Sequence, residues 1–332
     1  MSSLDLLIYK RKQLQFSSVK GKALTIQYAV TYSIFMTKTG YLAPIDLNDP
    51  LKSELKNIVQ EYDRLIIAEG PPQKVHWAQN IWYDPQIIPF QSISDAAKKL
   101  KSLNKLWSYY PYQNIRRAEL IKESLPYFSP KPLVFPATLP KSPLGSWTLL
   151  DAQTLLASPL CSSPFAQGEA LFAETKIPPS RAYLKLWEAL TLAGQMPKPG
   201  DLCLEVGASP GSWTWVLQQL GAKVIAVDRA ALDPTVARLP NVTALKKDAF
   251  AIGPQDYPEL SWIFSDLICY PEKLLSWVKQ WLDVGAKVNF ICTLKFQGEG
   301  GYQIVREFEK IEGSQIVHLF HNKHELTWIK IC

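Results

Sequence analysis

From about residue 173 onward, short apolar runs of strand length alternate with longer amphipathic stretches, and this alternation constrains the fold more than any other feature. Short apolar runs bounded by turn residues predict buried strands, whereas apolar spacings of three and four predict helices. Strands are expected at residues 202–206, 223–227, 242–245, 262–265 and 287–292. Helices are expected at residues 179–193, 212–220, 272–282 and 302–311. Such alternation is typical of an α/β domain with a mostly parallel sheet.

The two ends of this region differ from its middle. Two further strand-like runs, residues 315–320 and 326–331, are joined by a short polar link, which predicts an antiparallel hairpin. Upstream, eight prolines lie between residues 126 and 164, so this stretch is expected to be extended connection and edge strand. Within it, residues 147–157 predict a buried strand pair that turns at residues 151–153.

Charge is divided unevenly along the chain. Residues 1–172 contain 19 Lys and Arg against 13 Asp and Glu, whereas residues 173–332 contain 17 of each, so the net charge of +6 belongs to the first part. Residues 98–141 hold nine basic and two acidic side chains, interleaved with aromatic ones. Basic groups beside aromatic rings suit RNA phosphates and unstacked bases, although a solvated helix followed by core aromatics has the same composition. We therefore expect an RNA-binding region at residues 1–172 and a second domain at residues 173–332.

The candidate RNA-binding side chains are all basic. They are Lys98, Lys99, Lys101, Lys105, Arg116, Arg117 and Arg181. A helix is expected over the first of them, with Ser94 as its N-cap.

Several classes of protein are disfavoured by composition and motif. No apolar run is long enough to cross a membrane, and the first residues do not resemble a signal peptide, so we expect a cytoplasmic protein. Five cysteines, an odd number without a C-x-x-C spacing, predict reduced thiols rather than a disulfide framework or a structural zinc site. His321, His324 and Glu325 lie close together but depart from the H-E-x-x-H zinc pattern, so no metal is expected.

The strongest single motif is the turn L-E-V-G-A-S-P-G-S-W at residues 204–213, which follows an expected strand and opens an expected helix. Gly207 and Gly211 allow the backbone to approach a ligand closely. The dinucleotide fingerprint G-x-G-x-x-G needs a glycine where Ser209 stands. The turn therefore favours a nucleoside ligand without a diphosphate.

Two acids lie at strand ends near this turn. Asp228, 21 residues beyond Gly207, occupies the position from which a carboxylate accepts hydrogen bonds from ribose hydroxyls. Asp248 follows the third expected strand, where an acid can meet an adenine amino group. A tight turn with an acid at a strand end, without any ligand, remains the structural alternative.

The fuller pattern E-V-G-A-S-P-G-S-W resembles the S-adenosylmethionine motif D-L-G-A-x-P-G-G-W of FtsJ-like (RrmJ-type) RNA 2′-O-ribose methyltransferases, with Glu205 and Ser212 as the departures. The resemblance implies a class I Rossmann-like methyltransferase domain, a mostly parallel sheet ending in an antiparallel hairpin, behind an N-terminal α+β RNA-binding domain. It implies S-adenosylmethionine as cofactor. The implied cofactor-binding residues are Glu205, Gly207, Ala208, Ser209, Pro210, Gly211, Ser212, Trp213, Asp228, Asp248 and Asp266.

Four further positions match that family in order. Residues 180–188 resemble its S-R-x-x-x-K-L-x-E helix, which places Lys185 as the first catalytic lysine, and Asp266, Lys295 and Glu325 complete a K-D-K-E tetrad. The family's D-M-A-P-N continuation after the aspartate is absent. That variant is similar to the RlmM subfamily, which modifies a cytidine ribose of 23S ribosomal RNA and carries a THUMP-containing N-terminal region. The resemblance covers about residues 161–332.

The resemblance implies methyl transfer from S-adenosylmethionine to a ribose 2′-hydroxyl of structured RNA, with 23S ribosomal RNA as the partner. Lys295 is expected either to act as base or to orient the hydroxyl, with Lys185 and Glu325 holding the lysine and the ribose. Two alternatives stay open from the sequence: an RNA-binding protein with a non-catalytic methyltransferase fold, and a methyltransferase acting on a substrate other than RNA.

Overall fold

A computed structural model describes residues 38–128, 130–296 and 302–332. The described residues form one compact unit. The expected division near residue 172 therefore stays a prediction, and the part of it that concerns residues 1–37 lies outside the described residues.

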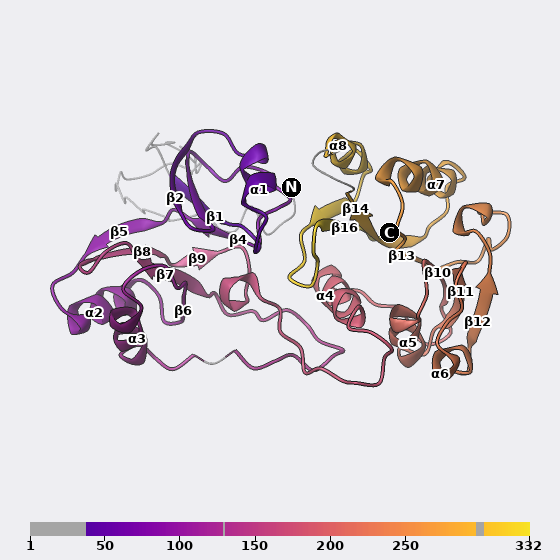
Figure 1. The fold of residues 1–332 in the computed structure, drawn as a ribbon, viewed down its shortest axis with the longest axis horizontal. Coiled ribbons are helices and arrows are strands. Elements are labelled where there is room, and N and C mark those ends of the chain that lie inside the picture. The colour runs from indigo at the N-terminus through magenta and orange to yellow at the C-terminus, as the bar shows by residue number, and fades with distance from the viewer. Residues whose placement is uncertain (1–37, 129, 297–301) are drawn as a thin grey trace, which may run out of the picture. The chain divides into compact units, whose positions relative to one another are not determined.

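The C-terminal part is built on a seven-stranded sheet with the order β12-β11-β10-β13-β14-β16-β15 (Figure 1). Its first five strands in the chain are parallel, whereas β16 runs antiparallel to both β14 and β15. This arrangement confirms the expected parallel sheet and its antiparallel end. The strands are β10 (Leu202–Val206), β11 (Lys223–Asp228), β12 (Val242–Lys246), β13 (Trp262–Ser265), β14 (Asn289–Lys295), β15 (Ser314–Val317) and β16 (Glu325–Lys330).

Helices cover both faces of this sheet (Figure 1). Leu204 packs in one apolar cluster with Trp277 of α7, whereas its neighbour Cys203 packs in another with Leu184 of α4 and Trp213 of α5. Successive side chains of a strand point to opposite faces, so both faces of β10 are buried, as parallel sheets require. The helical segments are α4 (Tyr183–Ala193), α5 (Ser212–Gln219), α6 (Pro234–Ala237), η2 (Ala249–Ala251), α7 (Pro271–Asp283) and α8 (Gln303–Glu309).

Several element bounds differ from the sequence prediction, including those of β14, which was expected over residues 287–292 and spans Asn289–Lys295. The helix expected from residue 179 begins at Tyr183, because the preceding Ser180 is held outside it by hydrogen bonds to Ser212. The strand expected over residues 315–320 ends at Val317, where the chain turns and the N–H of Asn322 donates to the Leu319 carbonyl at 3.0 Å. The short helices α6 and η2 were not predicted from the sequence.

The described residues before 172 contain two smaller sheets and three α-helices, which confirms an α+β architecture for this described part. A five-stranded antiparallel sheet has the order β2-β3-β1-β4-β9, and a four-stranded sheet has the order β5-β8-β7-β6. The strands are β1 (Lys38–Leu42), β2 (Ile58–Tyr62), β3 (Leu65–Glu69), β4 (Asn80–Tyr83), β5 (Gln86–Pro89), β6 (Trp107–Tyr109), β7 (Gly145–Leu149), β8 (Thr154–Ser158) and β9 (Leu160–Cys161). The helices are α1 (Asn48–Glu54), α2 (Ile93–Leu103), α3 (Ile115–Glu123) and the short η1 (Ala166–Gly168).

Most of the local predictions made for the residues before 172 are confirmed. The strands β7 and β8 pair antiparallel around the turn expected at residues 151–153. Residues 126–143, rich in proline, are mainly extended connection in their described part, as expected, and Leu133 forms a β-bridge with Phe172. The cap of α2 was predicted wrongly: Ser92, not Ser94, is the N-cap, and its Oγ accepts a hydrogen bond from the Asp95 N–H at 3.2 Å.

Candidate active site

The four residues of the expected tetrad meet at one edge of the large sheet. Asp266 directly follows β13, Lys295 ends β14, and the carboxyl ends of parallel strands share an edge. Glu325 begins the antiparallel β16 at the same edge and is paired in register with Lys295. Lys185 reaches the group from the first turn of α4. The sheet topology thus gathers side chains that are far apart in the sequence.

Their charged groups form a chain of alternating sign. The Lys185 Nζ lies 2.5 Å from Glu325 Oε1 and 3.2 Å from Asp266 Oδ1. The Lys295 Nζ lies 3.0 Å from the same Asp266 Oδ1 and donates to the Asp266 carbonyl oxygen at 2.7 Å. Two cations and two anions therefore compensate one another, with Asp266 between the lysines.

Thr293 belongs to this group and was missed in the sequence. Its hydroxyl donates to Asp266 Oδ1 at 2.7 Å. The signal was present in the spacing, because Thr293 stands two residues before Lys295 and side chains two apart on a strand share a face. The Thr293 hydroxyl, in the middle of the strand, restrains the Asp266 carboxylate that holds both lysines.

Lys185 and Lys295 differ in burial and in their charged neighbours. Burial alone would lower the pKa of Lys185, but Asp266 and Glu325 outweigh it and raise this pKa, so the side chain stays an ammonium. Burial alone would raise the pKa of Asp266, but Lys185 and Lys295 lower it overall. The Lys185 side chain is 10% exposed and that of Lys295 is 21% exposed. Lys295 is therefore the lysine with more access to a substrate.

The glycines of the turn at residues 204–213 are sterically required. Gly207 has a φ of +78°, and a Cβ there would come within 2.9 Å of the Cα and N of Leu267. Gly211 has a φ of +114°, and a Cβ there would lie 2.8 Å from Val236 Cγ1. The turn after β10 thus passes directly against the backbone that follows Asp266.

Hydrogen bonds tie this turn to the segment that carries Lys185. The hydroxyls of Ser212 and Ser180 lie 2.7 Å apart, and the Trp213 indole N–H donates to the Ala182 carbonyl at 2.9 Å. On its other side the turn is held by the Pro210 carbonyl, which accepts from the N–H of Asp233 at 2.9 Å. The predicted cofactor turn and the predicted catalytic helix are therefore one connected structure, in which Ala208 is a buried member.

Two of the predicted cofactor-binding acids lie at adjacent strand ends. Asp228, at the end of β11, accepts hydrogen bonds from the N–H groups of Ser209 at 3.0 Å and Ala230 at 2.8 Å. Asp248, after β12, caps η2 and forms an ion pair with Arg229. Both lie at the sheet edge that carries the glycine-rich turn, and their contact with a cofactor stays a prediction.

Glu205 has a different environment from these two. It is 2% exposed, and its carboxylate accepts a hydrogen bond from Thr214 Oγ1 at 2.5 Å. Burial raises the pKa of Glu205 to about 8. Its predicted role toward a cofactor also stays a prediction, and the observed partner of its carboxylate is the helix α5.

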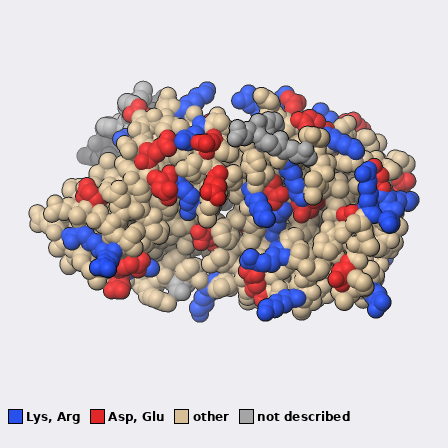
Figure 2. Space-filling model, viewed as in Figure 1, with Lys and Arg blue, Asp and Glu red and all other residues tan. Residues whose placement is uncertain are grey.

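Among the predicted RNA-binding side chains, Lys98, Lys101, Lys105 and Arg116 are exposed on or beside α2 and α3. The remaining three have partners within the protein. Lys99 pairs with Asp95 and donates to the Pro89 carbonyl, Arg117 lies over the Phe90 ring, and Arg181 forms two hydrogen bonds with Glu174. On the face drawn in Figure 2, basic and acidic side chains are interspersed.

The aromatic side chains of the same segment are mostly structural. Trp107 and Tyr110 are buried, and the Tyr109 ring packs on Trp147 with a centroid separation of 4.9 Å. Tyr127 is 90% exposed. Of the two alternatives that the sequence left open for these aromatic side chains, packing in the protein core holds for Trp107 and Tyr110.

The three neighbouring residues weighed as metal ligands have separate partners. His321 Nδ1 lies 2.7 Å from Glu188 Oε2, His324 Nε2 lies 2.8 Å from the Tyr302 hydroxyl, and Glu325 pairs with Lys185. Across the described ranges, no cluster of three His, Cys, Asp or Glu side chains has the geometry of a metal site. All five cysteines lie in these ranges as free thiols. The helices of the described chain include none of sufficient length and hydropathy to span a membrane.

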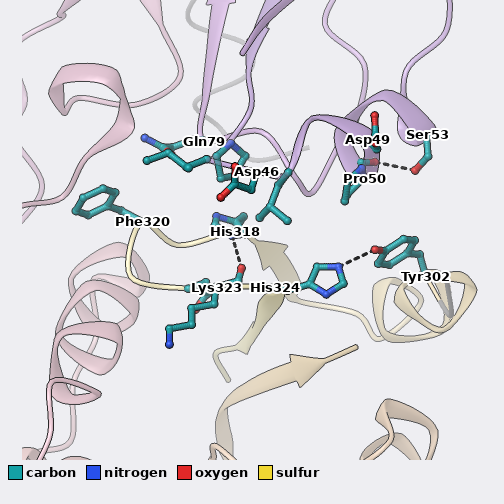
Figure 3. A pocket seen from close by; sticks show the side chains of 14 residues that line it. Asp46, Asp49, Pro50, Ser53, Gln79, Tyr302, His318, Phe320, Lys323 and His324 are labelled. Carbon is teal, nitrogen blue, oxygen red and sulfur yellow. Dashed lines mark hydrogen bonds between the residues drawn. The ribbon is translucent and has the colours of Figure 1, made fainter. Parts of the chain in front are cut away.

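A cavity of about 820 Å³ lies beside the loop that leads into Glu325 (Figure 3). Phe320 and Lys323 line it from this loop, and Asp46 and Gln79 line it from the residues before 172. The lining includes His324, which directly precedes Glu325, but none of the four residues of the tetrad.

Residues 178–327 match the FtsJ-like methyltransferase family. A curated relative, ribosomal RNA large subunit methyltransferase M of Halorhodospira halophila, is 32% identical over 157 residues, 45% of this chain and 46% of its own. The protein of the same name from Methylococcus capsulatus is 28% identical over 181 residues, 50% of this chain and 51% of its own. The chain thus spans about half the length of the curated relatives that it matches.

Structural alignment gives weaker likenesses. The solved structure of magnesium protoporphyrin IX methyltransferase from Synechocystis aligns over 45% of this chain and 78% of its own, with 16% identity and a TM-score of 0.34. A score in that range adds nothing to the sequence match. The match to the FtsJ-like methyltransferase family thus covers residues 178–327, the part of the chain that contains most of the seven-stranded sheet and all four residues of the tetrad.

Proposed function

We propose that this protein transfers a methyl group from S-adenosylmethionine to a ribose 2′-hydroxyl of structured RNA, with 23S ribosomal RNA as the substrate. The observation that carries this proposal is the charge chain Glu325, Lys185, Asp266, Lys295 beside the glycine-rich turn. The names of the curated relatives support a large-subunit ribosomal RNA.

The residues around the turn fit the cofactor. A Cβ at Gly207 or Gly211 would clash with neighbouring atoms of the protein, so only glycine fits at these two positions of the turn. Asp228 and Asp248 provide carboxylates at the neighbouring strand ends. Such carboxylates can accept hydrogen bonds from ribose hydroxyls and an adenine amino group. When bound, S-adenosylmethionine supplies a methyl group already activated by a sulfonium leaving group.

Because the leaving group is good, the protein's task is to position the 2′-oxygen and to stabilise the charge that develops on it. A lysine ammonium has three N–H donors. Two of those on Lys295 are directed to Asp266 oxygens, so we assign the third to the ribose 2′-oxygen. With the methyl group supplied by the bound cofactor, Lys295 would hold the 2′-oxygen in line for the transfer while the hydroxyl proton is released to solvent.

Lys185 has a supporting part in this proposal. It lies deeper than Lys295 and joins Asp266 to Glu325, so it neutralises both carboxylates and keeps them in place. Thr293 restrains the same Asp266 oxygen. Lys185, Thr293 and Glu325 thereby fix the direction in which Lys295 points.

The test combines binding and turnover. Calorimetry with S-adenosylmethionine should give binding, and NAD should not compete; absence of binding, or preference for NAD, contradicts the proposed function. Methyl transfer from labelled cofactor to 23S ribosomal RNA transcribed in vitro should be lost in Lys295→Ala and kept in Lys287→Ala, an exposed lysine two residues before the start of β14. If Lys295→Ala binds cofactor and transfers methyl at the wild-type rate, the role assigned to Lys295 is wrong.

We further propose that residues 1–172 bind the RNA. The support is the net positive charge of this region together with the four exposed basic side chains on or beside α2 and α3. Electrostatic contacts of this kind hold phosphates without reading sequence, so they would orient the RNA for the methyltransferase domain.

A further inference from the structure

Trp77 lies in the segment between β3 and β4, outside the FtsJ-like domain, and yet packs among rings of that domain. Its side chain is fully buried. The centroid of its ring lies 5.5 to 5.7 Å from those of four others. The five rings, called here the aromatic cluster, belong to Trp77, Phe296, Tyr302, His318 and His324.

Two members of the aromatic cluster adjoin the tetrad in sequence. Phe296 directly follows Lys295, and His324 directly precedes Glu325. Lys295 and Glu325 are paired across β14 and β16. Trp77 therefore packs against the residue next to each member of this pair.

The backbone that carries Trp77 is anchored on both sides. Glu54 Oε2, from α1, accepts from the N–H groups of His76 at 2.7 Å and Trp77 at 3.1 Å. The His76 carbonyl accepts from the N–H of His318 at 3.1 Å, and the His76 ring lies between Glu54 and Glu309 of α8 at 2.6 and 2.9 Å. These hydrogen bonds fix the backbone at Trp77, and so they fix the position of its indole in the aromatic cluster.

Hydrogen bonds link three other rings of the aromatic cluster, those of Tyr302, His318 and His324, to the loop that leads into Glu325. In Figure 3, His324 faces the Tyr302 hydroxyl, at 2.8 Å, and His318 faces the Lys323 carbonyl. Because a carbonyl only accepts, His318 Nε2 donates in that bond, at 2.9 Å. The loop is therefore held through its rings, and the indole fills the space between them.

We propose that Trp77 is a positioning residue for methyl transfer: through Phe296 and His324 it sets the placement of Lys295 and Glu325. The residues before 172 would then complete the catalytic geometry in addition to binding RNA. This inference rests on the proposed function. Removing a large buried ring leaves a cavity into which neighbours relax, and misplacement of catalytic groups by about 1 Å can cost about 100-fold in rate.

Trp82 provides a matched control. It is also fully buried, on β4, but packs in a separate apolar cluster with Leu42, Leu65 and Tyr110. Neither indole N–H has a hydrogen-bond partner among the described residues, so replacement by phenylalanine removes no observed bond at either position. Loss of bulk at Trp82 tests general destabilisation, whereas loss of bulk at Trp77 tests positioning.

The experiment uses the full chain with Trp77→Ala, Trp77→Leu, Trp77→Phe and Trp82→Ala, assayed for cofactor affinity and for steady-state transfer to in vitro transcribed 23S ribosomal RNA. In Trp77→Ala and Trp77→Leu, kcat should fall by about 10- to 100-fold with little change in KM for RNA. The aromatic Trp77→Phe should recover most of kcat, and Trp82→Ala should keep the wild-type kcat in its folded fraction. Trp77→Leu decides the question if Trp77→Ala does not fold.

Hydrogen–deuterium exchange gives a readout that does not depend on activity. Exchange in peptides containing Phe296 and His324 should rise in Trp77→Leu and not in Trp82→Ala. Wild-type kcat in Trp77→Leu, or unchanged exchange in those peptides, overturns the positioning role while leaving the proposed function intact. A wild-type protein without methyl transfer contradicts the proposed function, and the exchange experiment then still decides whether Trp77 orders the tetrad edge.

Discussion

Replacing Lys185 by methionine removes one of the two cations that neutralise Asp266 and Glu325 while keeping an unbranched side chain of similar length. At separations of 2.5 and 3.2 Å, an effective dielectric constant of about 20 gives gross attractions of about 7 and 5 kcal/mol. Most of this attraction offsets the free-energy cost of removing the buried charges from water. Removing one partner of such a pair leaves a buried carboxylate uncompensated, for which we expect a net loss of about 3–5 kcal/mol of unfolding free energy.

The pH dependence of this loss follows from the pKa shifts. The pKa of Lys185 is raised, so its contribution is full below the unfolded value of 10.5 and is lost as pH rises through the folded value. The pKa of Asp266 is lowered, so its contribution is full above the unfolded value of 3.8 and is lost as pH falls through the folded value. Between these limits the cost of Lys185→Met should be constant, and it should shrink in stronger acid.

Urea unfolding near neutral pH is the assay, with Glu325→Gln and the double variant completing a cycle. The double variant should be more stable than Lys185→Met alone, because it buries no unpaired carboxylate at position 325. Lys198→Met, at an exposed lysine after α4, should change stability by less than about 0.5 kcal/mol. A loss below about 1 kcal/mol in Lys185→Met, or no coupling in the cycle, refutes the buried charge chain.

Three further predictions follow from other parts of the structure. Gly207→Ala should weaken S-adenosylmethionine binding at least tenfold by calorimetry, because the new Cβ would lie 2.9 Å from backbone atoms of Leu267. Gly285→Ala is the control: Gly285 also has a positive φ, but a Cβ there would have no neighbour within 4 Å, so cofactor binding should be unchanged. Burial opposes a charged His76, but Glu54 and Glu309 raise its pKa overall, so its stabilisation is full below 6.5 and is lost as pH rises through the folded value. Urea unfolding should therefore show a larger loss in His76→Gln near pH 5.5 than near pH 9, and equal losses would contradict this assignment. Neutralising the exposed basic side chains should weaken RNA binding and leave the affinity for the cofactor unchanged. The plot of log binding constant against log salt concentration should become shallower by about 0.7–0.9 for each phosphate that is no longer neutralised. An effect on activity that does not depend on salt would point to a substrate other than RNA. The residues to change are Lys98, Lys101, Lys105 and Arg116.

Local patterns in the sequence were enough for the elements of the large sheet. Strand and helix periodicity act over a few residues, so β10 and β13 were predicted with their observed bounds. The turn at residues 204–213 was likewise predicted from its glycines, and Gly207 and Gly211 both have a positive φ in the structure. Where tertiary contacts compete with local preference, the prediction was wrong, as at the start of α4, which Ser180 and Ser212 delay to Tyr183.

The candidate site was determined only in part by the sequence. The tetrad was predicted from the order of its four residues along the chain, Lys185, Asp266, Lys295 and Glu325. The distances between their charged groups depend on the register of the strands and on a helix packed against the sheet. Trp107 illustrates the limit, because composition alone does not distinguish a base-stacking ring from a core ring.

Amino-acid order by itself determined the α/β alternation, the glycine-rich turn and the set of residues able to do the chemistry. Tertiary structure decided which lysine is buried, that Thr293 joins the site and that Trp77 packs beside it. The physical reason is range: backbone preferences act between near neighbours, whereas ion pairing and ring packing join segments whose proximity exists only after the sheet has formed.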